Sequence, residues 1–134
     1  EHVPEPEKAI NELYRVLVKG GKLVLTTRFV YPLHDVPHDY YRYTKYSLKR
    51  LFQRWSEVII QPESKSFSTI AILIQRICFQ SSLRFGKAMK FVLFIIAKVV
   101  SWLDFLILSE YGDIKKISKE TEIMSTGYYV VAKK

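Results

Sequence analysis

The sequence lacks the features of disulfide-rich, secreted and membrane-spanning proteins. Its single cysteine, Cys78, cannot form an internal disulfide, which fits a reducing compartment and leads us to expect a cytoplasmic protein. No basic start followed by a short apolar run marks a signal peptide. Lys98 and Asp104 interrupt the longest apolar stretch, so no segment reaches the roughly 18 uncharged apolar residues expected of a spanning helix.

The residues that are present are ordinary for one globular domain. The 134 residues are 49% hydrophobic and 25% charged, which excludes a disordered tail and a collagen-like repeat. A formal net charge of +8 permits contact with phosphate-rich partners, but charge alone does not indicate a nucleic-acid partner, and we expect none. The chain opens abruptly on the motif EHVP at residues 1–4, and we expect it to be the C-terminal part of a longer protein.

The first thirty residues predict a helix, a turn and a strand. Apolar residues recur at helical spacing over about 5–18, and Gly20-Gly21 is a typical left-handed helix stop. An uninterrupted apolar run then predicts a strand over 22–28 that is covered on both faces, as in a parallel sheet. The other expected elements are helices at about 45–55, 67–80 and 85–108 and strands at about 57–61 and 127–132. This succession predicts an α/β fold.

A polar and aromatic segment, residues 30–44, follows the first strand. It contains two histidines, two aspartates and four tyrosines. It begins after the carboxyl end of a strand, which is where open α/β sheets bind their ligands. Two interpretations of the histidines stay open: one of them acts as a general base beside a carboxylate, or both bind substrate or brace the loop.

Three motifs that occur in this order resemble a known family. They are EHVPEP at 1–6, LYRVL followed by KGGKLVL over 13–25, and PHDYYRYT at 37–44. Together they resemble the C-terminal half of a class I S-adenosylmethionine-dependent methyltransferase of the type 11 kind. The last motif is similar to a segment of members that act in polysaccharide or lipid-linked sugar pathways. The resemblance implies an α/β fold, a partial Rossmann-like methyltransferase sheet, with a helical insertion at about 64–125 before the last strand.

The resemblance also implies an activity and a cofactor. Residues 1–134 would be the C-terminal part of a single methyltransferase domain, whose missing N-terminal half belongs to the same protein. The intact enzyme would transfer a methyl group from S-adenosylmethionine to a small-molecule, saccharide or lipid-linked acceptor. In the family, a glycine-rich turn and an acidic residue on earlier strands build most of the cofactor site, and no Gly-x-Gly occurs here. We therefore expect this part of the enzyme to be inactive alone.

The site residues follow from the same resemblance. The expected catalytic residues are His34, His38 and Asp39, and the expected acceptor-binding residues are Tyr40, Tyr41 and Arg42. His2 would line the cofactor side, or otherwise hydrogen-bond within its own loop. Alternatively, Arg42 pairs with Asp39, and the tyrosines pack the loop onto the sheet. We expect no metal, because the histidines of the loop and Asp35 are loosely spaced.

Residues 67–108 are much more apolar than the rest of the chain and allow two interpretations. They pack as a helical cap over the substrate side, or their wide apolar face lies in a membrane surface with lysines toward anionic headgroups. The second interpretation would make this a peripheral membrane protein. The rival to the enzyme is a non-catalytic, membrane-associating or partner-binding domain that retains half of the methyltransferase fold.

Overall fold

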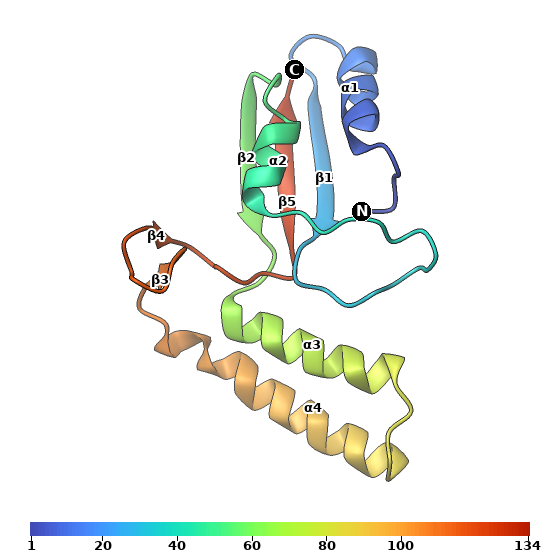
Figure 1. The fold of residues 1–134 in the computed structure, drawn as a ribbon, viewed down its shortest axis with the longest axis vertical. Helices are drawn as coiled ribbons and strands as arrows, with labels where there is room; N and C mark the ends of the chain where they lie inside the picture. Colours follow the sequence, from blue (N-terminus) through green and yellow to red (C-terminus); the bar gives the residue numbers. More distant parts are fainter. The chain divides into compact units, whose positions relative to one another are not determined.

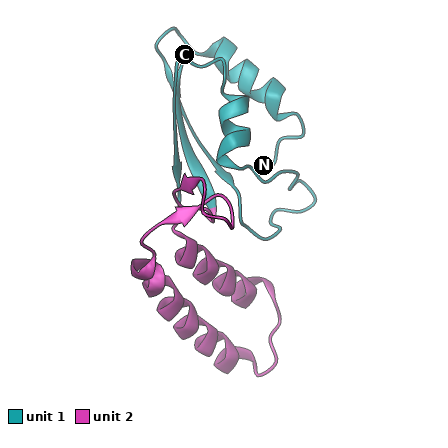
Figure 2. Cartoon of the chain, turned by 60° about the vertical axis from the view of Figure 1, so that its left-hand side comes forward, with its two compact units in different colours: residues 1–63, 127–134 teal, residues 64–126 magenta.

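The computed structural model describes residues 1–134, and these form two compact units (Figure 2). Unit 1 comprises Glu1–Glu63 and Gly127–Lys134, and unit 2 comprises Ser64–Thr126. The chain therefore forms most of the first unit, builds the second, and returns to the first for its last strand. Unit 2 spans nearly the same residues as the helical segment expected at about 64–125.

Unit 1 begins with helix α1 (Pro6–Val16), which is followed by strand β1 (Lys22–Arg28). Proline fits the first turn of α1, where its missing N–H has no intrahelical partner, and a glutamate there complements the helix dipole. Gly20 in the connecting turn has a φ of 78°, in the left-handed region that glycine adopts without strain. Helix, turn and strand lie within a few residues of their predicted positions.

Helix α2 (Lys45–Leu51) and strand β2 (Glu57–Pro62) follow in unit 1. The hydroxyl oxygen of Thr44 accepts a hydrogen bond of 3.1 Å from the amide three residues further on, and so caps the start of α2. The helix is shorter than predicted, because the chain turns after it. Phe52 and Trp55 reach the core from these turns.

Strand β5 (Gly127–Lys133) lies between β1 and β2 and runs antiparallel to both (Figure 1). β1 and β2 therefore run in the same direction without pairing, and each forms an edge of the three-stranded sheet. The prediction of a parallel sheet around β1 is wrong for this structure, because the strand that pairs with β1 is the antiparallel β5. An apolar strand pattern indicates burial and does not encode the direction of the neighbouring strand.

Only one face of this sheet is covered by helices. α1 and α2 pack on that face, where the buried core comprises Ile10, Tyr43, Leu48, Phe52, Trp55, Tyr128, Val130 and Ala132. On the other face Val24 is 69% exposed and Ile59 is 56% exposed, and both lie opposite Val131 in the register. The prediction that residues 22–28 are buried on both faces is therefore wrong, because alternate side chains point to the uncovered face.

Unit 2 contains helices α3 (Ser66–Gln80) and α4 (Gly86–Trp102) and a 3-10 helix, η1 (Leu103–Leu106). α3 and α4 pack along each other as a helical hairpin (Figure 1). The side chains of Cys78 and Ala97 are fully buried in this unit.

The long helix predicted over 85–108 ends earlier because η1 turns Asp104 toward the start of α3. The Asp104 carboxylate accepts hydrogen bonds from the amides of Phe67 at 2.9 Å and Ser68 at 3.2 Å, so it caps the first turn of α3. The connection that follows carries two short paired strands, β3 (Glu110–Tyr111) and β4 (Lys119–Glu120). None of the helices combines the length and the apolar character needed to cross a bilayer.

Candidate functional site

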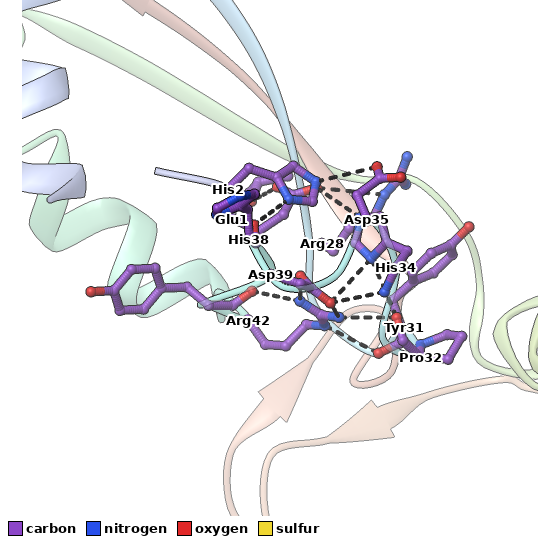
Figure 3. A network of polar contacts seen from close by, with 12 residues as sticks. Glu1, His2, Arg28, Tyr31, Pro32, His34, Asp35, His38, Asp39 and Arg42 are labelled. Carbon is purple, nitrogen blue, oxygen red and sulfur yellow. Dashed lines mark hydrogen bonds and ion pairs between the residues drawn. The ribbon is translucent and has the colours of Figure 1, made fainter. Parts of the chain in front are cut away.

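The loop of residues 30–44 leads from β1 to α2 and lies against the first residues of the chain (Figure 3). The amide of Tyr40 donates to the carbonyl oxygen of Glu1 at 3.0 Å, and Nδ1 of His2 donates to the carbonyl oxygen of His38 at 2.7 Å. Two motifs that are separated in the sequence therefore meet. The resulting polar cluster comprises Glu1, His2, Arg28, His34, Asp35, His38, Asp39 and Arg42.

Asp39 and Arg42 form a partly buried ion pair within this polar cluster. Two guanidinium N–H groups donate to the two carboxylate oxygens at 2.6 Å each, and the Asp39 side chain is only 1% exposed. Asp39 also accepts a hydrogen bond of 3.0 Å from the amide of His34. The hydrogen bonds from Arg42 hold the pKa of Asp39 well below its ordinary value, and Asp39 in turn raises the pKa of Arg42. Both groups are therefore charged at neutral pH.

All five N–H groups of Arg42 are used inside the loop. Besides the two that bind Asp39, they donate to the carbonyl oxygens of Tyr31 at 3.1 Å, Pro32 at 3.0 Å and Tyr41 at 2.8 Å. In this arrangement the guanidinium has no donor left for a substrate phosphate. Arg42 thus holds the loop, and its predicted role in acceptor binding rests on the resemblance alone.

Glu1 lies at the centre of the polar cluster. Its Oε2 accepts a hydrogen bond of 2.7 Å from the hydroxyl of Thr27, and its Oε1 lies 3.6 Å from Nε2 of His34 and 3.7 Å from Nε2 of His2. Burial raises the pKa of Glu1, but the Thr27 hydrogen bond and nearby positive charges outweigh burial, so the pKa lies below its ordinary value. The carboxylate is therefore ionised at neutral pH.

His34 is held between two carboxylates and is largely buried. Its Nδ1 lies 3.4 Å from Oδ2 of Asp39 and 3.3 Å from the carbonyl oxygen of Pro32, whereas its Nε2 faces Glu1. The ring also meets Tyr31 edge-on, with the centroids 5.2 Å apart. In the tautomer that carries its hydrogen on Nδ1, this hydrogen points to Asp39 and Pro32, and Nε2 is the atom that can accept a proton.

His38 and Asp35 lie at the exposed rim of the polar cluster. Nδ1 of His38 is 2.9 Å from the tyrosine hydroxyl two residues further on. The Asp35 carboxylate is 82% exposed and lies 3.9 Å from Nε2 of His2. The ion-pair contact of His34 in the loop is thus with Asp39, five residues away, and its sequence neighbour Asp35 contacts His2 instead.

Tyr40, Tyr41 and Tyr43 lie side by side along the loop with their rings tilted. The centroids of Tyr40 and Tyr41 are 6.4 Å apart, and those of Tyr41 and Tyr43 are 5.8 Å apart. The Tyr41 hydroxyl donates to the carbonyl oxygen of Pro4 at 2.8 Å. Burial raises the pKa of Tyr43 to about 12. Tyr40 and Tyr41 keep exposed ring surface, so they stay available for contact with an acceptor.

A cavity of about 130 Å³ lies beside Glu1, between α1, α2 and β1. Its walls are mostly apolar and include Leu13, Leu25 and Phe52, and Thr27 adds a polar atom next to Glu1. Small-molecule sites usually measure roughly 300–1,000 Å³. The cavity can hold a small group, but it is too small for a nucleoside-containing cofactor.

Sequence reasoning missed Thr27 and Arg28, the last two residues of β1. Thr27 donates to Glu1, and Arg28 approaches Glu1 at 4.0 Å and Glu63 at 2.5 Å. Neither residue belongs to a recognised motif. The available signal was their position, since polar residues at the carboxyl end of an apolar strand face the ligand crevice of an α/β sheet.

Comparison with models of protein families, with curated proteins and with solved structures finds no match to this chain. Its function is therefore argued from the site and from the resemblance of its motifs.

Proposed function

We propose that unit 1 is part of an S-adenosylmethionine-dependent methyltransferase and that the polar cluster lines the acceptor side of its site. The proposal rests mainly on the contact between residues 1–4 and the loop of residues 30–44. The motif resemblance assigns the first segment to the cofactor side and the second to the acceptor side. Both segments lie at the carboxyl end of β1, where ligands of open α/β sheets bind.

The strand order is compatible with this proposal. β1 and β2 run in the same direction and are joined through α2, which packs on one face of the sheet. β1 forms an edge, so its outer N–H and C=O groups can pair with further strands of a longer protein. Such strands would supply the glycine-rich part of the cofactor site that this chain lacks.

In the proposed reaction His34 is the general base. S-adenosylmethionine would supply an electrophilic methyl group to the acceptor oxygen, with its sulfur as the leaving group. The acceptor proton passes to Nε2 of His34, whose Nδ1 side is oriented by Asp39. His38 and Tyr40 at the rim would contact the acceptor, and His2 would face the cofactor.

Calorimetry with S-adenosylmethionine tests the proposal. The whole protein as its gene encodes it should bind the cofactor with a saturable heat signal. The 134-residue chain should bind at least about 100-fold more weakly, because it lacks the glycine-rich turn that builds much of the family's cofactor site and because the cavity beside Glu1 is small. A whole protein that gives neither binding heat nor a cofactor-dependent rise in Tm contradicts the proposal.

A second candidate function, association with a membrane surface, is favoured by one face of α4. The α4 outer face comprises Phe91, Val92, Ile95, Ile96, Val99 and Trp102. Phe91 is 68% exposed and Trp102 is 70% exposed. At 100° per residue these six positions span an arc of about 140°, and such an apolar arc is what interfacial helices bury among lipid headgroups.

The charges of unit 2 fit an anionic surface. Lys87 and Lys98 border the apolar arc on the helical wheel. Residues 64–126 contain nine lysines and arginines but only five aspartates and glutamates, so this unit is attracted to anionic lipid. A lipid-linked acceptor would link this surface to the proposed methyl transfer.

Co-sedimentation with vesicles tests the second candidate. The 134-residue chain should pellet with vesicles of mixed phosphatidylcholine and phosphatidylserine at low salt. The double variant Phe91→Ser, Trp102→Ser should stay in the supernatant, whereas the matched control Val24→Ser, Ile59→Ser in unit 1 should pellet normally. A native chain that stays in the supernatant at low salt overturns this candidate.

A further inference from the structure

We infer that Glu1, His2 and His34 bind a divalent transition-metal ion through one carboxylate oxygen and two imidazole nitrogens. The inference does not rest on the proposed methyl transfer and competes with one part of it, because a metal ion on Nε2 of His34 occupies the lone pair that the proposed general base would use. It depends only on how these three side chains, which come from two distant segments of the chain, face one another (Figure 3).

The three ligand atoms converge on one point. Nε2 of His34 lies 3.6 Å and Nε2 of His2 lies 3.7 Å from the same oxygen, Oε1 of Glu1. All three atoms lie within 4.8 Å of one another. Ligands at about 2.0–2.2 Å from a zinc-like ion are about 3.4 Å apart in tetrahedral geometry. The two separations to Glu1 are therefore close to coordination distances, and the more exposed His2 is the ring that would move to complete the site.

The other nitrogen of each ring already faces an acceptor. Nδ1 of His2 lies 2.7 Å from the carbonyl oxygen of His38, which can only accept, so this nitrogen carries the hydrogen. Nδ1 of His34 lies 3.3 Å from the carbonyl oxygen of Pro32 and 3.4 Å from Oδ2 of Asp39. Metal-binding histidines characteristically donate their second N–H to a carbonyl or a carboxylate in this way.

One metal ion can satisfy all three atoms at once. In the tautomer that carries its hydrogen on Nδ1, each ring offers the lone pair of Nε2, and the Glu1 carboxylate adds an anionic oxygen. These are donors that transition-metal ions take from histidine and glutamate.

The donor set selects the class of ion. Two imidazoles and one carboxylate suit zinc, iron(II) or cobalt(II), whereas Mg²⁺ and Ca²⁺ prefer oxygen ligands throughout. Three protein ligands leave positions open for water or for the hydroxyl group of a bound molecule. The exposed carboxylate of Asp35, 3.9 Å from Nε2 of His2, lies within reach as a further oxygen ligand.

Titration with cobalt(II) tests the inference on the tag-free 134-residue chain after chelator treatment. At about pH 8, where an ordinary histidine is neutral, Co²⁺ should produce visible absorption bands that saturate at about one ion per chain and that Zn²⁺ abolishes. Zn²⁺ alone should raise the Tm of the chain. These readouts require neither S-adenosylmethionine nor an acceptor, so their failure is distinguishable from failure of the proposed methyl transfer.

Variants of single ligands locate the ion. His34→Ala and Glu1→Gln should each weaken Co²⁺ binding at least ~100-fold, because loss of even an outer partner of a ligand costs 10–100-fold. Glu1→Gln keeps a side-chain oxygen that can accept the hydrogen bond from the Thr27 hydroxyl. This variant therefore tests the inference if His34→Ala does not fold. His38→Ala should bind Co²⁺ as the native chain does, because its ring bonds to Tyr40 and its carbonyl is retained.

The absence of Co²⁺ bands together with an unchanged Tm in Zn²⁺ overturns the inference. It is equally overturned if Glu1→Gln binds Co²⁺ as tightly as the native chain. Binding that His38→Ala abolishes while Glu1→Gln retains it also contradicts the inference, because the ion then lies at the rim.

Discussion

Arg42 illustrates how one side chain can fix a long loop. Its planar guanidinium reaches Asp39 and three carbonyl oxygens at the same time. Lysine would keep the charge but offers three donors from a single nitrogen, so it cannot reproduce this fork. The conformation of residues 30–44, and with it the position of His34, depends on this pair.

We expect Asp39→Asn to lower the free energy of unfolding by about 2 kcal/mol, because it removes two charge-assisted hydrogen bonds from the partly buried guanidinium of Arg42. Urea unfolding followed by circular dichroism measures the change. Asp35→Asn removes a carboxylate that is 82% exposed and should change the stability by less than about 0.5 kcal/mol. Equal effects of the two substitutions would show that the ion pair has no special role.

The same ion pair predicts a loss of stability in acid. The pKa of Asp39 in the folded protein lies below 3.8, the value of an unperturbed aspartate. The stability that the ionised Asp39 side chain adds to the folded protein is therefore complete above about pH 3.8. It is lost as the pH falls toward the pKa of Asp39 in the folded protein. Urea unfolding between about pH 5 and pH 2 should show a steeper decline for the native chain than for Asp39→Asn. Parallel curves would contradict this assignment.

Sequence reasoning found most of the residues of the site but not their partners. His34, His38 and Asp39 were predicted from one short segment, and the structure places all three in or at the rim of the polar cluster. It pairs His34 with Asp39 and with Glu1, which lies 33 residues away along the chain. Such contacts depend on the path of the loop, and no local spacing encodes that path.

Among the elements, the turn between α1 and β1 is the one whose geometry depends most on glycine. Gly20 has a φ of 78°, and a Cβ placed there would meet no atom within 4 Å. The requirement for glycine at this position is therefore conformational and involves no packing conflict. Gly21 differs, because a Cβ there would lie 2.7 Å from Cδ2 of Leu17.

We expect Gly20→Ala to lower the free energy of unfolding by about 1 kcal/mol, since alanine in the left-handed region is strained. Gly20→Asn should cost less, because asparagine tolerates this conformation better. Thermal unfolding should give the highest Tm for the native chain, a lower Tm for Gly20→Asn and the lowest for Gly20→Ala. A more stable alanine variant would show that the turn does not keep its positive φ in solution.

The predicted elements begin close to their predicted positions, because helical periodicity and capping are local properties, whereas α2 and α4 end earlier than predicted. The pairing of the strands was not predictable in the same way. β5 inserts between β1 and β2 although it comes last in the sequence, and no side-chain pattern in β1 indicates an antiparallel neighbour. The exposed face that carries Val24 and Ile59 was not predicted either. A continuous apolar run predicts a strand that is covered on both faces of its sheet.

On the scale of the whole molecule, the two chain connections of unit 2 start from neighbouring positions of unit 1. Pro62 lies opposite Tyr128 in the register of β2 and β5, and the amide of Glu63 donates to the carbonyl oxygen of Gly127 at 3.0 Å. Residues 64–126 therefore take the place that a tight turn occupies in a β-hairpin.

We expect unit 1 to fold when residues 64–126 are replaced by Asn-Gly, the dipeptide that suits a two-residue hairpin turn. The shortened chain should unfold cooperatively in urea and retain the near-ultraviolet signal of Trp55. A matched chain with Pro-Pro at the same place should be less stable, because proline cannot adopt the positive φ that this turn requires. A shortened Asn-Gly chain without cooperative unfolding would show that unit 1 needs the inserted segment.

The backbone hydrogen bond between Glu63 and Gly127 also has an evolutionary consequence. Genetic recombination at this point can exchange one inserted segment for another of any length without shifting the register of a single strand. Sequences that share the loop chemistry of residues 30–44 can therefore differ throughout residues 64–126.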